Sequence, residues 1–132
     1  MPQNYNLDHP WVRGKEILVI KGSFAPNGSS TPTNPTGGHI KSVAWTSTGK
    51  WTVTLRDKGI RAIEAFMVCA QLNADNVDVT LSLGAFTNVG AGQTGDTTFI
   101  VRNAPGGSVA DIAANANNVI SFTIWARRSV NK

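Results

Sequence analysis

The chain has 132 residues and a mass of 14.0 kDa, which is typical of one domain that buries its own core. Hydrophobic residues make up 41% of it and charged residues 15%, and this composition excludes an intrinsically disordered protein. The formal net charge is +4, but the basic residues are dispersed from Arg13 to Lys132. Because nucleic-acid binding favours a clustered stripe of cations, we expect no nucleic-acid partner. The net charge fits contact with an acidic protein surface equally well.

Residues 1–14 show no periodicity of either helix or strand, and we interpret them as an arm in front of a domain at 15–132. The arm carries Tyr5, Trp11 and Arg13, residue types that anchor protein interfaces. The N-terminus lacks the pattern of a signal peptide, and no apolar run approaches the roughly 20 residues of a membrane span. We therefore expect a chain that is made in a cytoplasm, has no membrane partner, and uses its arm to contact a neighbour.

Residues 16–24 predict the first strand. Four consecutive apolar residues from Ile17 to Ile20 indicate a strand that is covered on both faces. Residues 25–38 contain three of the six prolines and predict a long exposed loop.

Residues 43–55 predict a hairpin. Inward-facing apolar residues alternate on both sides of a turn at Ser47-Thr48-Gly49, and Gly49 suits the left-handed position that such a turn needs. This register sets Trp45 opposite Trp51, and the aromatic pair would fix the alignment of the two strands.

The second half of the chain predicts four more strands, at residues 62–72, 77–83, 99–101 and 120–125. Alternation in the first of these places Phe66 and Val68 on one face and Met67 and Cys69 on the other. Cys69, the only cysteine, excludes an intrachain disulfide and is expected to behave as a small core residue.

Residues 108–117 are the one segment with helical character. Ser108 followed by Asp111 resembles a capping box and predicts one or two helical turns. Because long helices are missing from the pattern, parallel βαβ units are excluded. The sequence thus predicts an all-β, single-domain antiparallel β-sandwich or jelly-roll-like barrel with one short helical segment near 108–117.

Motifs that carry chemistry are weak. Residues 90–95 match G-x-G-x-x-G, but a strand-like segment follows where dinucleotide binding needs a helix. His9, His39 and one cysteine are too few for a zinc site. Four aspartates in turns are expected to bind nearby backbone N–H groups, and these are Asp75, Asp78, Asp96 and Asp111. No Gly-x-Ser-x-Gly elbow is present. We expect no catalytic residue, no metal, no cofactor and no enzymatic activity.

Three segments together resemble short virion proteins of tailed bacteriophages: GSFAPNGS at 22–29, GKWTVTLRD at 49–57 and ADIAANANN at 110–118. The resemblance extends from Gly22 to Phe122. It implies a structural protein on the capsid surface of a virion, made in the host bacterial cytoplasm. The protein would be a capsid decoration (cement) protein, often a homotrimer, that bridges major capsid protein subunits and stabilises the phage head.

The arm and Arg127-Arg128 lie outside this resemblance. We take Tyr5, Trp11, Arg13, Arg127 and Arg128 as the candidate contacts to the capsid or between subunits.

The alternative hypothesis is a receptor- or carbohydrate-binding β-sandwich module of a phage tail or fibre. In that case an exposed tryptophan, Trp45, Trp51 or Trp125, would stack on a sugar ring.

Overall fold

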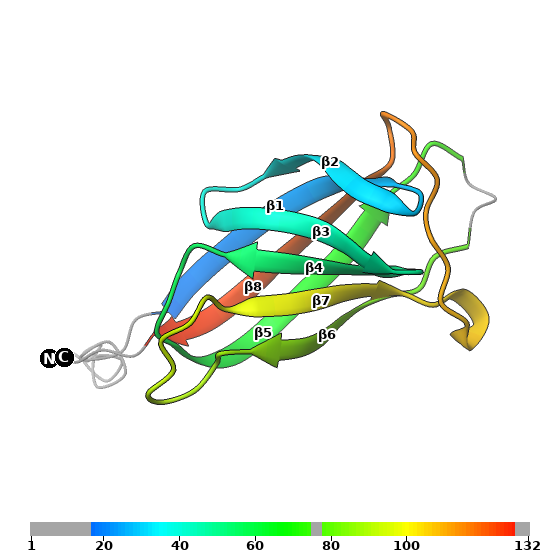
Figure 1. Cartoon of the computed structure of the whole chain (residues 1–132). Helices are drawn as coiled ribbons and strands as arrows, with labels where there is room; N and C mark the ends of the chain where they lie inside the picture. The colour runs from blue at the N-terminus through cyan, green and yellow to red at the C-terminus, as the bar shows by residue number, and fades with distance from the viewer. Residues whose placement is uncertain (1–16, 75–77, 129–132) are drawn as a thin grey trace, which may run out of the picture.

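Two antiparallel four-stranded sheets pack face to face in the computed structural model, which describes residues 17–74 and 78–128 (Figure 1). Sheet A has the strand order β2-β1-β8-β5, and sheet B has the order β3-β4-β7-β6. The strands are β1 (Ile17–Asn27), β2 (Ser30–Thr36), β3 (Ile40–Ser47), β4 (Lys50–Leu55), β5 (Ile60–Gln71), β6 (Leu81–Thr87), β7 (Thr98–Asn103) and β8 (Val119–Arg128). The prediction of an all-β sandwich is confirmed.

Aromatic contacts join the two sheets across the core. Phe24 of sheet A packs on Trp51 of sheet B with 5.8 Å between ring centroids. Phe122 of sheet A meets Phe99 of sheet B edge to face at 5.2 Å. Such pairs contribute about 0.5–1.5 kcal/mol beyond the burial of their area. The two sheets are therefore held in one relative position by interlocking rings.

The predicted β3–β4 hairpin is confirmed, including its register. Trp45 pairs with Trp51, and a bulge between Trp45 and Ser47 accommodates the turn. Gly49 has a φ of +67°. A Cβ at this position would lie 2.6 Å from the carbonyl oxygen of Asn103, so the turn needs glycine for both its conformation and its space.

The predicted loop at 25–38 is wrong, because most of it forms a second hairpin. β1 continues to Asn27, which pairs with Ser30 across a turn of two residues. The chain then returns as β2, which contains Pro32 and Pro35. Since β2 is the edge strand of sheet A, one side of it needs no hydrogen-bonding partner, and an edge position of this kind tolerates proline.

The helical segment predicted near 108–117 is also wrong. The helical turn in this region is a 3-10 turn at Pro105–Gly107. Asp111, expected to cap a helix, instead accepts hydrogen bonds from Trp45 Nε1 at 2.9 Å and from Gly49 N at 2.6 Å. These distant partners hold its segment in an irregular conformation. No helix in the described residues is long and apolar enough to span a membrane.

The strand predicted at 77–83 begins later than expected, at Leu81, and continues to Thr87. The buried Asn103 accounts for this difference. Its Oδ1 accepts from Thr80 N at 2.9 Å, and its Nδ2 donates to Ala110 O, also at 2.9 Å. Because a side chain takes the place of a ladder partner at Thr80, regular pairing starts only after it. The other three predicted strands are confirmed as β5, β7 and β8.

Candidate interaction surface

The structure describes two of the five predicted contact residues. Arg127 and Arg128 are the last two residues of β8. Tyr5, Trp11 and Arg13 lie outside the described residues, so the predicted arm stays a prediction.

The two arginines lie beside the start of β5. Arg127 is in register with Ile17 of β1 on one side and with Ala62 of β5 on the other. Its guanidinium forms an ion pair with Glu64. Arg128 is exposed and is the last residue of the strand. One corner of sheet A is therefore rich in arginine, next to Ile17 at the beginning of β1.

The outer face of sheet A is apolar at this end. Val19, Trp125 and Ala65 stand opposite one another on three adjacent strands, β1, β8 and β5. Exposed fractions are 41% for Val19, 49% for Ile17 and 65% for Met67. We call these five residues, Ile17, Val19, Ala65, Met67 and Trp125, the sheet A patch. Exposed apolar side chains that lie close together are common at sites of contact with other molecules.

This patch corrects the prediction for the first strand. β1 is central in its sheet, as expected, and Ile20 is fully buried in the core. Its outer face is nevertheless open, because no described element packs over Ile17 and Val19. The apolar run Ile17–Ile20 thus has the composition of a strand buried on both faces, while residues 17–74 and 78–128 cover only one of them.

The expectation that Cys69 behaves as a small core residue is wrong for a related reason. Cys69 is exposed and lies opposite Ser121, on the same side of β5 as Met67. Phe66 has the register of an inward-facing residue, yet 49% of it is exposed. β5 is the last strand of sheet A, so its side chains have a neighbouring strand on one side only.

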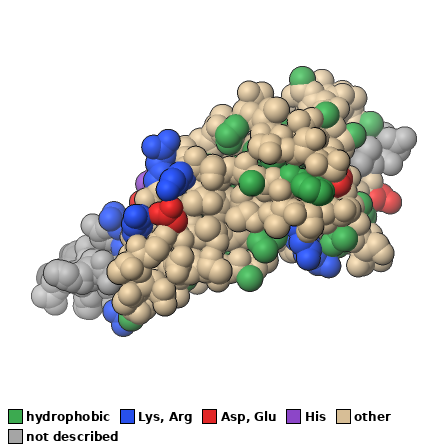
Figure 2. Space-filling model, in the orientation of Figure 1, with side chains coloured by type: hydrophobic (Ala, Val, Ile, Leu, Met, Phe, Trp, Pro, Cys, Tyr) green, Lys and Arg blue, Asp and Glu red, His purple; other side chains and the backbone are tan. Residues whose placement is uncertain are grey.

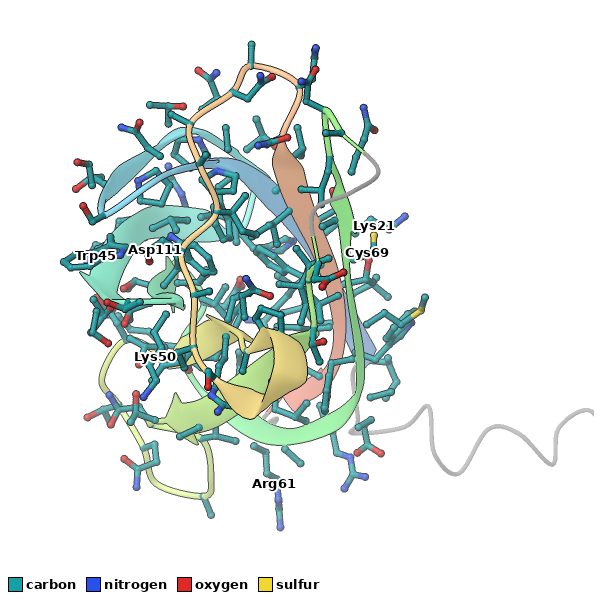
Figure 3. All side chains as sticks on the ribbon, turned by 90° about the vertical axis from the view of Figure 1, so that its right-hand side faces the viewer. Lys21, Trp45, Lys50, Arg61, Cys69 and Asp111 are labelled. Atoms are coloured by element: carbon teal, nitrogen blue, oxygen red, sulfur yellow. The ribbon has the colours of Figure 1, made fainter. Side chains whose placement is uncertain are left out.

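Two shallow depressions flank the middle of β8 on the outer side of sheet A. The larger, of about 330 Å³, lies between Lys21 and Thr123, and the smaller, of about 90 Å³, lies between Thr123 and Met67. They exist because Ser121 and Thr123 are short beside their neighbours. Figure 3 shows Lys21 and Cys69 on this same side of the sandwich, and β8 runs between their strands. The surface beside the sheet A patch is therefore hollowed and can receive a protruding side chain.

The outer face of sheet B has a different composition. A row of hydroxyl side chains crosses all four of its strands, in the order Ser42, Thr54, Thr98 and Thr87. The hydroxyls of Thr87 and Thr98 are hydrogen-bonded to each other. Figure 2, which looks at the side on which sheet B lies, shows hydrophobic side chains only as scattered spots there. This face suits contact with water.

Charged side chains gather at one end of the sandwich. Asp96 accepts a hydrogen bond from Lys41 Nζ at 2.7 Å and lies 3.5 Å from Lys58 Nζ. The hydrogen bond from Lys41 is the main cause that lowers the pKa of Asp96, and the charges of both lysines add to it against partial desolvation. His39 Nδ1 lies 2.6 Å from Asp57 Oδ2, a pairing that the loop position of His39 did not suggest. Within residues 17–74 and 78–128, no group of three or more His, Cys, Asp or Glu could hold a metal.

The three tryptophans considered for sugar binding lie in different environments. Trp51 is fully buried. Trp45 is half-buried and donates its indole N–H to Asp111, next to which it lies in Figure 3. Trp125 is half-buried within the sheet A patch. Of the three, Trp125 is the one whose ring belongs to the outer face of sheet A.

The G-x-G-x-x-G match lies in the connection between β6 and β7. Gly90 N donates to the carbonyl oxygen of Ile60, which fixes the loop against β5. The chain then enters β7 at Thr98. This loop leads into a strand, whereas a pyrophosphate site needs the N-terminus of a helix.

Comparisons of the chain with protein-family models, with curated proteins and with solved structures found no match. Its function is therefore inferred from its own residues and geometry.

Proposed function

We propose that this chain is a structural virion protein, a capsid decoration (cement) protein that self-associates and stabilises a phage head by bridging major capsid subunits. The sheet A patch carries this proposal. One outer face of the sandwich is apolar and the opposite one is covered with hydroxyls, an arrangement that suits a protein with a partner bound on one side only. The resemblance of residues 22–29, 49–57 and 110–118 to phage virion proteins supports the choice of partner.

The patch supplies apolar surface for contacts between copies and with the shell. Burying a side chain such as Val, Ile or Met stabilises a complex by about 1.5–3 kcal/mol when it was fully exposed before, and by less when it was half-exposed. Several such side chains close together give a contact that needs no catalytic group. The function proposed is mechanical, and we propose no enzymatic role.

Basic groups around the patch favour an acidic partner surface. Lys21 lies at its border, and Arg127 lies in the next row across the sheet. Arg127 forms an ion pair with Glu64, which compensates its charge, so Lys21 and the net charge of the chain are the features that favour an acidic partner. The chain as a whole carries a net charge of +4. Charge of this kind increases the rate of association with an acidic capsid surface and makes it sensitive to salt.

The test is to measure the mass of the purified chain by light scattering, alone and with empty capsids of its source. Co-sedimentation with capsids supports the proposal, and the resemblance implies a homotrimer as the assembled form. A variant without residues 1–14 tests the arm: we expect loss of capsid attachment with the oligomer intact. A monomer that ignores capsids would contradict the decoration role.

The alternative, a receptor- or carbohydrate-binding module of a tail or fibre, draws on one observation. Trp125 offers part of its ring on an outer face. Its neighbours in the same row are Val19 and Ala65, which cannot hydrogen-bond to sugar hydroxyls. A glycan panel tests this function: binding that a Trp125→Ala substitution abolishes would favour it over the decoration role.

A further inference from the structure

The two edges of sheet A differ in how they are protected against pairing with another strand. β2 forms one edge and contains Pro32 and Pro35, together with two register shifts against β1. Proline removes a backbone donor, and irregular register twists an edge away from a flat template. The β2 edge is therefore a poor acceptor for a further strand.

β5 forms the other edge, and its two halves are unequal. The first half contains Arg61 and Glu64 and two register shifts against β8. The second half, Ala65–Gln71, pairs with β8 residue by residue without a shift. Its sequence, AFMVCAQ, has no charged residue and no proline. The devices that natural sheets use to block an edge are present in the first half and missing from the second.

The free edge of this second half carries apolar side chains on both sides. Phe66 is 49% exposed toward the inner side of the sheet, and Met67 is 65% exposed on the outer side. β5 has β8 as its one strand partner, so alternate N–H and C=O groups of Ala65–Gln71 point away from the sheet. Among the backbone hydrogen bonds outside the ladders of the described residues, the one to β5 reaches Ile60, at the far end of the strand.

We propose that a second copy of this chain adds its β5 to this edge, antiparallel, across a two-fold axis close to Met67. The two A sheets would then form one continuous sheet. This inference rests on the self-association in the proposed function and assigns the contact between copies to Ala65–Gln71. Ile17, Val19 and Trp125 would then remain available to contact the capsid shell. It also replaces the homotrimer that the resemblance implies by an assembly with an even number of copies.

The segment is complementary to itself. With the axis at Met67, each Met67 faces the other, Phe66 faces Val68 of the second copy, and Glu64 faces Ala70. No like charges meet, because Glu64 lies three residues from the axis and Arg61 lies beyond the paired segment. Apolar side chains thus meet apolar side chains on both faces of the joined sheet, and the free backbone groups gain partners.

Cross-linking through single cysteines tests the geometry. In a Cys69→Ser background, Met67→Cys brings two thiols together at the axis, where facing Cα atoms of antiparallel strands lie about 4.5–5.5 Å apart. Mild oxidation should give a disulfide-linked dimer. Thr33→Cys, an exposed position on the β2 edge, is the matched control and should stay monomeric on a denaturing gel. Equal cross-linking at both positions, or none through Met67→Cys in a chain that oligomerises, would overturn the pairing.

A charge at the same place tests the energetics. Met67→Lys sets two ammonium groups against each other across the axis, and we expect self-association at least about tenfold weaker. Thr33→Lys is the control and should have no effect. Both side chains are exposed, so circular dichroism and urea unfolding should match the unmodified chain.

The outcomes separate the two proposals. An oligomer that Met67→Lys leaves intact, or a light-scattering mass of three copies, overturns the β5 pairing while the proposed self-association stands. A monomer at every concentration overturns the pairing as well, and capsid co-sedimentation then tests the decoration role independently.

Discussion

The two outer faces of the sandwich are built on sheets of equal strand number, yet they present opposite chemistry. Sheet B presents a row of serine and threonine hydroxyls, whereas sheet A presents the sheet A patch. Hydroxyls can hydrogen-bond to water or to each other, so sheet B is complete within one chain. Apolar side chains in water gain nothing until another surface covers them. The difference indicates that the stability of the fold comes from within the chain, while the contacts proposed for its function lie on sheet A.

The largest expected effect on the free energy of unfolding comes from the β3–β4 turn of sheet B. Gly49→Ala adds a Cβ 2.6 Å from a backbone oxygen at a residue with φ +67°. Strain and overpacking together should lower the free energy of unfolding by about 3 kcal/mol. Urea denaturation measures this loss.

Gly28→Ala is the matched control in the hairpin of sheet A. Its φ is +58°, and nothing lies within 4 Å of the added atom. The expected loss is about 1 kcal/mol, from the left-handed conformation alone. Equal losses at both glycines would show that the close packing of the sheet B turn is not what stabilises it.

The next effect concerns the contact that closes sheet B. Asp111→Ala leaves Trp45 Nε1 and Gly49 N without their acceptor. We expect a loss of about 2 kcal/mol in the free energy of unfolding, because both donors are partly buried. Asp111→Asn keeps an acceptor oxygen and should lose less. If the two variants unfold alike, the hydrogen bonds contribute little to stability.

A third prediction exchanges the chemistry of the two faces. Val19→Thr with Met67→Thr gives sheet A the surface of sheet B, and we expect about tenfold weaker association with other copies or capsids. The free energy of unfolding of the monomer should stay within about 0.5 kcal/mol. Thr54→Val on sheet B should leave association unchanged. Analytical ultracentrifugation measures all three proteins, and unchanged association of the double variant would contradict the role of the patch.

The smallest effect is that of pH on the charged end. Because the pKa of Asp96 is lowered in the folded chain, its ion pairs stabilise the fold above the ordinary pKa of an aspartate. This stabilisation is lost as the pH falls through the lowered value. Asp96→Asn should therefore unfold more easily than the unmodified chain at pH 6, and the difference should shrink as the pH falls below the ordinary pKa of an aspartate. High salt should reduce the difference at pH 6, since the group is solvent-exposed.

The sequence predicted the elements whose pattern is local. Alternating residues identified β4, β5 and β8, a short apolar run identified β7, and Gly49 identified the turn with Trp45 opposite Trp51. β2 was missed because Pro32 and Pro35 indicate a loop unless the strand is known to be an edge. The helix near 108–117 was predicted from Ser108 followed by Asp111, but the partners of Asp111 are more than 60 residues away in sequence. Local patterns carry no signal for such contacts.

The surface was harder to predict than the core. Alternation correctly placed Met67 and Cys69 on one face of β5, but it could not tell whether that face is covered. Covered and open faces of this strand have the same apolar composition. The one available signal was the run Ile17–Ile20, which is apolar on both sides, and only the open sheet shows that one of these sides faces outward.

The pairing of β1 with β8 has a consequence for the order in which the chain folds. Ile17 is in register with Arg127, so the first and last described strands lie side by side, and β8 is the strand that joins β1 to β5. During synthesis, sheet A cannot close until β8 has left the ribosome, about 100 residues after β1. Closing so long a loop costs entropy before any contact compensates for it, which makes folding slow for a domain of this size. Until then Ile17, Val19 and Met67 stay exposed on unpaired strands, and nascent chains are open to premature association with each other.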